Sequence, residues 1–215
     1  MKKIISLLLV LVLAFSFVSC LNEGTSDDDN ETTKKKTEDV VISRGTIVGT
    51  KYKNDCMGLE FTRPSSWVYA TDEEIALAIG VGAEMLGSDK FQDALNNSTA
   101  IYDMMVIDKL TNANIIVGYE NLKRSLSSNI TEEQYIEMVK KQFSGVTSIT
   151  VTFPSGTSKV KLGETTFTRV VCKTTANGVT ITQVYYVHKI GHYMGMIIVS
   201  IPSGFTVEEI EAMFS

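Results

Sequence analysis

The chain has 215 residues with 20 basic and 25 acidic side chains, which gives a formal net charge of −5 at pH 7. Residues 44–215 are nearly neutral, with 15 basic and 18 acidic groups. They therefore lack the basic surface of a nucleic-acid-binding domain and give no reason to expect tight binding to anionic lipid. A segment of that length can enclose one core, so residues 44–215 are expected to form a single domain.

The first 19 residues have the pattern of a bacterial export signal. Lys2 and Lys3 form a charged start, the run Ile4–Val18 is apolar apart from two serines, and the small residue Ser19 follows. An uncleaved membrane helix is an alternative, but 15 apolar residues fall short of the roughly 20 that a bilayer core needs. We expect residues 1–19 to be a signal peptide.

Cys20 is the first residue after this signal. The sequence Phe17-Val18-Ser19-Cys20 resembles the lipobox of bacterial lipoproteins, with Phe17 where that motif usually has leucine. Ordinary signal cleavage is the alternative, although it prefers a small residue where Phe17 stands. The resemblance implies that Cys20 carries the attached fatty acids (palmitate-type acyl chains). It also implies that the protein is anchored on the extracytoplasmic face of a membrane in the bacterial cell envelope.

Residues 20–43 form a predicted lipidated N-terminus and tether. From residue 21 to Val40 the segment is acidic and almost free of apolar side chains. Such a composition cannot offset the entropy lost on folding, so we expect a disordered tether. A chain of this length spans roughly 25–30 Å.

The rest of the chain alternates between strand and helix patterns. Three capping boxes, Thr71 with Glu74, Thr131 with Gln134 and Thr206 with Glu209, predict helix starts. A short helix is expected at 90–95. Expected strands lie at 46–53, 58–61, 67–69, 100–109, 115–121, 148–153, 158–162, 166–173, 179–189 and 192–201.

Turn residues predict two hairpins in the last third. Asn177-Gly178 is the typical dipeptide of a two-residue hairpin loop. Around Gly191 we expect a three-residue loop, Lys189 to Gly191, because a shorter loop that placed Ile190 at positive φ would be strained. Both faces of these strands are apolar, so we expect helices on both sides of the sheet.

The three-residue loop would place His188 opposite His192 on one face, within reach of one metal ion. A two-residue loop would place them on opposite faces. Zinc needs a third and usually a fourth ligand, and the turn supplies none. The two histidines are therefore weak metal candidates, with two polar residues at a sheet rim as the alternative, and no cofactor is expected.

Cys56 and Cys172 remain after Cys20 is assigned to lipid. In an exported protein such a pair could form a disulfide. The alternative is two small buried thiols. The spacing in the sequence does not decide between them.

The chain also resembles PsbP-like domains. The similarity starts with Gly58-Leu59-Glu60-Phe61, Pro64 and Trp67, and continues through residues 120–122, 131–143, 162–167 and 183–187 to the short final helix. The resemblance implies an α+β fold, an α/β/α sandwich around an antiparallel sheet. Relatives include the extrinsic photosystem II subunit, a Ran-binding nuclear-import factor and several bacterial lipoproteins, which are mostly non-enzymatic.

Two functions are compatible with these features. The first is a lipid-anchored binding or accessory protein whose partner is a protein or an envelope component. The alternative is a metal-dependent or thiol enzyme that uses His188, His192 or a cysteine. No GxSxG elbow and no Gly-rich phosphate loop is present, so the first function is expected.

Overall fold

The computed structural model describes residues 40–80 and 82–215. The predicted signal peptide, Cys20 and most of the tether lie outside the described residues. Among the described helices, none is long and apolar enough to cross a bilayer.

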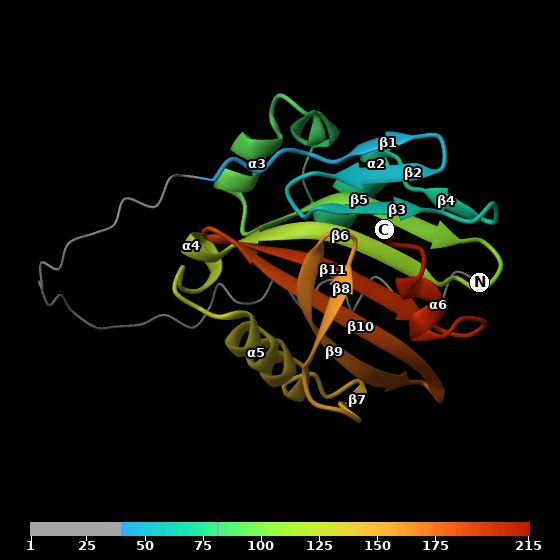
Figure 1. Ribbon diagram of the computed structural model, residues 1–215. Coiled ribbons are helices and arrows are strands. Elements are labelled where there is room, and N and C mark those ends of the chain that lie inside the picture. The colour runs from blue at the N-terminus through green and yellow to red at the C-terminus, as the bar shows by residue number, and fades with distance from the viewer. Residues whose placement is uncertain (1–39, 81) are drawn as a thin grey trace, which may run out of the picture.

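The described chain folds into a large and a small antiparallel sheet with short helices (Figure 1). The eight-stranded sheet has the order β4-β5-β6-β11-β10-β9-β7, with β8 also paired to β9, and the small sheet has the order β1-β2-β3. The strands are β1 (Thr46–Val48), β2 (Lys51–Asn54), β3 (Leu59–Thr62), β4 (Trp67–Tyr69), β5 (Ala100–Asp108), β6 (Asn114–Asn121), β7 (Thr150–Thr152), β8 (Ser158–Leu162), β9 (Thr165–Ala176), β10 (Val179–Ile190) and β11 (Tyr193–Ile201). The helices are α2 (Asp72–Ile79), η2 (Ala83–Leu86), α3 (Phe91–Asn97), α4 (Leu122–Ser125), α5 (Glu132–Ser144) and α6 (Val207–Glu211).

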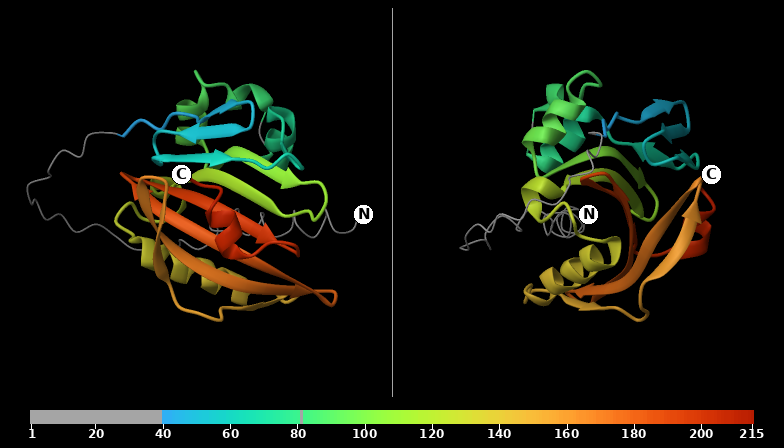
Figure 2. Two further views of the ribbon diagram at one scale, coloured as in Figure 1. Left: turned by 45° about the vertical axis from the view of Figure 1, so that its right-hand side comes forward. Right: turned by 60° about the vertical axis from the view of Figure 1, so that its left-hand side comes forward.

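The large sheet is strongly curved, and different elements lie against its two faces (Figure 2). Neighbouring residues of a strand point to opposite faces. On β6, the hydroxyl of Tyr119 bonds Asn54 of the small sheet, while the next residue, Glu120, accepts a hydrogen bond from Tyr135 of α5. The small sheet and α5 therefore cover opposite faces of the large sheet, α5 over β9 and β10.

The α+β class and the antiparallel sheet are confirmed. All three predicted capping boxes are formed, at Thr71, Thr131 and Thr206, each with hydrogen bonds in both directions. The separate sheet β1-β2-β3 was not predicted, because nothing in the local pattern distinguishes a strand of a second sheet from one of the first.

An aromatic cluster holds the C-terminus against the small sheet. The ring of Phe61 on β3 lies 5.2 Å from that of Phe214 and 6.4 Å from that of Trp67, which is fully buried. Glu60 and Ser215 exchange backbone hydrogen bonds of 2.8 and 2.9 Å. The last residues thus extend the edge of the small sheet.

The hairpin at Asn177-Gly178 is confirmed, with Ala176 opposite Val179. Both loop residues have positive φ, 51° at Asn177 and 77° at Gly178. This matches the backbone that a type I′ turn requires.

We predict that Gly178→Ala destabilises the protein by about 1 kcal/mol, because only the backbone conformation opposes a methyl group there. Urea unfolding measures the change. Gly156→Ala is the matched control, since that glycine is also in open space but does not have positive φ. Equal effects of the two substitutions would contradict this explanation.

Candidate functional site

The described chain begins with a segment that we call the entry strap, residues 40–45, which connects the predicted tether to β1. It forms no strand. Ile42 in its middle is only 1% exposed, and its backbone N–H donates to Gln92 Oε1 at 2.5 Å. Val40 packs beside Gly191 at the β10–β11 turn. The predicted tether boundary at residue 43 therefore falls inside a packed segment.

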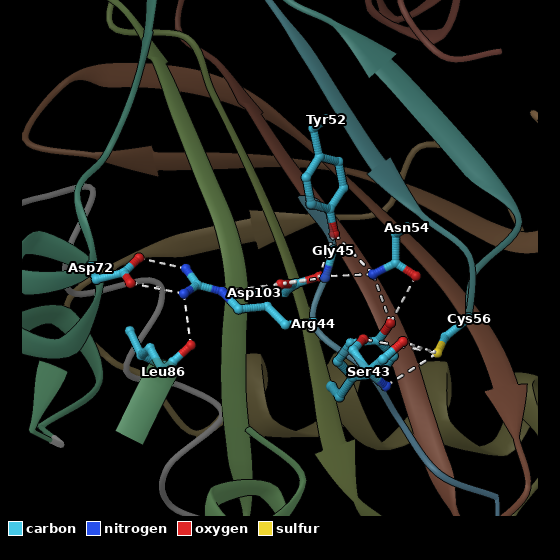
Figure 3. A network of polar contacts seen from close by, with 10 residues as sticks. Ser43, Arg44, Gly45, Tyr52, Asn54, Cys56, Asp72, Leu86 and Asp103 are labelled. Carbon is cyan, nitrogen blue, oxygen red and sulfur yellow. Dashed lines mark hydrogen bonds and ion pairs between the residues drawn. The ribbon is translucent and has the colours of Figure 1, made fainter. Parts of the chain in front are cut away.

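Arg44 clamps the strap to three parts of the domain (Figure 3). Its guanidinium donates to both carboxylate oxygens of Asp72 at 2.8 and 2.5 Å and to the carbonyl of Leu86 at 2.6 Å. Its Nε lies 3.6 Å from Asp103 Oδ1. The bidentate hydrogen bonding from Arg44 lowers the pKa of Asp72, as expected for a carboxylate fixed by a guanidinium.

Asp103 is the centre of a buried polar network below the strap. Asp103 is only 1% exposed. Its carboxylate accepts hydrogen bonds from the backbone N–H of Gly45 at 3.0 Å, from the hydroxyl of Tyr52 at 2.5 Å and from the side-chain amide of Asn54 at 2.8 Å. Burial raises the pKa of Asp103, and the hydrogen bonds act against that shift. One carboxylate thus connects the strap and β2 to β5.

A β-bulge aims Asp103 into this network. The register between β5 and β6 shifts between Tyr102 and Met104, which pair with the adjacent residues Gly118 and Val117. The extra residue in a bulge is free to point away from the regular alternation. This site was not predicted from the sequence, although a carboxylate in the middle of an apolar strand is a signal, since charged residues are seldom fully buried without partners.

We predict that Asp103→Asn lowers the free energy of unfolding by about 3 kcal/mol, because the amide replaces one acceptor oxygen with a donor and removes the charge that faces Arg44. Urea unfolding at neutral pH measures this. Asp93→Asn on the exposed side of α3 is the control and should change stability by less than about 0.5 kcal/mol. A loss below 1 kcal/mol at Asp103 would show that the network is not important for stability.

The possible disulfide is not formed: Cys56 and Cys172 are both free thiols. Cys56 is half-buried beneath the strap, and its sulfur lies 3.3 Å from both the backbone N and the hydroxyl of Ser43. Cys172 is buried in β9, and burial raises the pKa of its thiol to about 11. A thiol with that pKa is scarcely ionised at neutral pH, so Cys172 is a poor nucleophile.

The predicted pairing of the two histidines is wrong. The β10–β11 loop has two residues, Gly191 and His192, with Ile190 opposite Tyr193, so His188 lies opposite Gly195. Gly191 itself takes the positive φ of 60°, which leaves Ile190 unstrained in the strand.

The structure places the two histidines in separate surroundings. The His188 ring packs edge-on against Phe167 at 5.7 Å, and the His192 ring lies 4.0 Å from that of Tyr193. Within residues 40–80 and 82–215, no three His, Cys, Asp or Glu side chains are grouped so that they could hold a metal ion.

His188 instead adjoins a polar cluster at the start of α5. Glu132 Oε1 lies 3.3 Å from His188 Nδ1 and accepts the backbone N–H of Lys189 at 3.0 Å. Its other oxygen accepts from Thr168 and from Lys159. Burial would raise the pKa of Glu132, but these hydrogen bonds outweigh it and lower the pKa. The cluster fastens the helix to β8, β9 and β10.

A lowered carboxyl pKa has a definite consequence for stability. The Glu132 contribution is fully present above the pKa of the unfolded chain, about 4.3, and is lost as pH falls through the lower pKa of the folded state. We predict that Glu132→Gln destabilises the protein at pH 7 and that the difference from the wild type shrinks as the pH falls towards 3. Urea unfolding at several pH values measures this.

Glu137→Gln serves as the comparison, because Glu137 forms an exposed pair with Lys140 and such pairs contribute little. If the loss of stability caused by Glu132→Gln were independent of pH, the hydrogen-bonded carboxylate would not be its source.

An open groove of about 770 Å³ lies beside α4 and α5. Apolar side chains and two glutamates contribute to its lining, which consists of Leu126, Ser127, Asn129, Ile130, Glu133, Gln134, Glu137 and Met138. The ammonium group of Lys189 connects it to β10 by bonding the carbonyls of Ser128 and Ile130. The groove is a surface that a partner could contact.

No family model and no curated protein matches the chain. Among solved structures, a protein from Bacteroides thetaiotaomicron VPI-5482 is similar, with 13% sequence identity and a TM-score of 0.41. The match covers 78% of this chain and 48% of the other, so the chain spans about half the length of that protein. A likeness this distant does not identify the function.

Proposed function

We propose that the protein is a lipid-anchored binding or accessory protein on the extracytoplasmic face of a bacterial membrane. The observation that carries this proposal is Cys20, placed directly after a charged start and an apolar run of signal-peptide length. Two acyl chains bury many methylenes at about 0.8 kcal/mol each, which makes a lasting anchor.

The way in which the chain enters the domain supports this proposal. If the tether is held in a membrane by lipid, any pull on the domain acts on the residues where the tether enters the domain. Here that point is fastened by Arg44 and by the burial of Ile42. We further propose that the domain is a PsbP-like sandwich, since α5 on one face and α3 with the small sheet on the other agree with that architecture.

The partner would be a protein or a component of the envelope, as in most relatives that the resemblance names. The groove beside α4 and α5 offers one contact surface. The enzyme alternative gains no specific support, because His188 and His192 are not paired and the Cys172 thiol has a raised pKa.

We predict that Cys20→Ala abolishes lipid attachment and lipoprotein processing, and that globomycin, which blocks lipoprotein signal processing, leaves the full precursor in the membrane. A Cys20→Ala variant processed and anchored as before would contradict the lipid assignment. Membrane fractionation with intact-mass spectrometry measures both. Cys56→Ala is the matched control, since it removes a free thiol of the domain and should leave the acylated mass change intact. A mature N-terminus at another residue, without fatty acids, would contradict the proposal.

A further inference from the structure

The entry strap is attached to the domain in an unusual way. Its backbone N–H groups at Ile42, Ser43 and Gly45 all donate to side chains, those of Gln92, Cys56 and Asp103. By contrast, the next segment, β1, is paired with β2 in a regular ladder. The strap is therefore fastened by individual side chains, whereas the sheets on either side of it are joined through cooperative backbone pairing.

This attachment allows the strap to leave without disturbing either sheet. Detaching residues 40–45 breaks the Arg44 contacts and the Gly45 hydrogen bond to Asp103 and exposes Ile42. Tyr52 and Asn54 keep their hydrogen bonds to Asp103, and the first ladder pair that opening meets is Thr46 with Lys53. Segments held by few backbone bonds open locally at a lower free energy than the sheet core. The Arg44 guanidinium contributes most of the charged contacts, so it sets the strength of the attachment.

We propose that the entry strap is a releasable joint, which opens as a unit while both sheets stay intact. Opening adds six residues to the tether, about 20 Å at full extension. It also uncovers Cys56 and the surface that Ile42 buries, and it lets the domain stand further from the membrane. The change in distance from the membrane rests on the proposed lipid anchor, whereas the opening of the strap does not.

Hydrogen exchange of the full mature chain at increasing urea concentrations tests the proposal. The amides of Ile42 and Gly45 should exchange at least about tenfold faster than those of β10 and β11, with little dependence on urea, as for local opening. Strap amides that follow the same urea dependence as the central strands would overturn the proposal, because the strap would then open only when the whole domain unfolds.

Arg44→Met provides a second readout. It should accelerate exchange in the strap by about tenfold or more, the effect of losing hydrogen bonds to a charged group, and leave β10 and β11 unchanged. Arg63→Met is the matched control, because Arg63 bonds the Trp67 carbonyl outside the strap. If Arg44→Met accelerated hydrogen exchange equally in the strap and in the central strands, the proposal would be contradicted. If that variant does not fold, the urea dependence of exchange in the wild type still decides.

The two free thiols allow an independent check by alkylation, with each cysteine followed by peptide mass spectrometry. Arg44→Met should raise the alkylation rate of Cys56, which lies beneath the strap, and leave that of Cys172 in β9 unchanged. Equal changes at both thiols would indicate global unfolding and overturn the proposal. If the strap opens but Cys20 carries no lipid, only the proposed anchor is contradicted.

Discussion

The arrangement of this domain depends on one buried carboxylate. Moving an unpaired carboxylate into a protein interior costs several kcal/mol, so Asp103 can be accommodated only if donors surround it. These donors come from Gly45 in the entry strap and from Tyr52 and Asn54 in β2. The small sheet must therefore be in place before the large sheet can bury Asp103 at low cost, and the strap adds one further donor.

The strand opposite the bulge is adapted to the same constraint. Gly118 on β6 faces the bulged part of β5, and a Cβ atom there would come within 2.7 Å of the Ile101 carbonyl oxygen and 2.9 Å of the Tyr102 ring. Only glycine permits this close approach without displacement of the backbone. The glycine in the middle of β6 and the aspartate in the middle of β5 are thus parts of one feature.

Most local signals in the sequence were reliable, but the loop length at Gly191 and the long-range contacts were not predicted. The capping boxes and the Asn177-Gly178 hairpin are confirmed, because a helix start or a tight turn is decided by a few adjacent residues. The histidine pairing failed because moving a turn by one residue changes every cross-strand partner. Asp103 lies far along the sequence from Arg44 and Tyr52, so no local pattern could bring it to them. The predictions for residues 1–39 lie outside the described residues and stay predictions.

A double-mutant cycle between Tyr52→Phe and Asp103→Asn tests most directly whether Asp103 couples the small sheet to the large one. If the hydrogen bond between them joins the sheets, the two substitutions are not additive, and the coupling energy from urea unfolding should be at least about 1 kcal/mol. Additive effects, with a coupling energy near zero, would contradict the central role of this carboxylate.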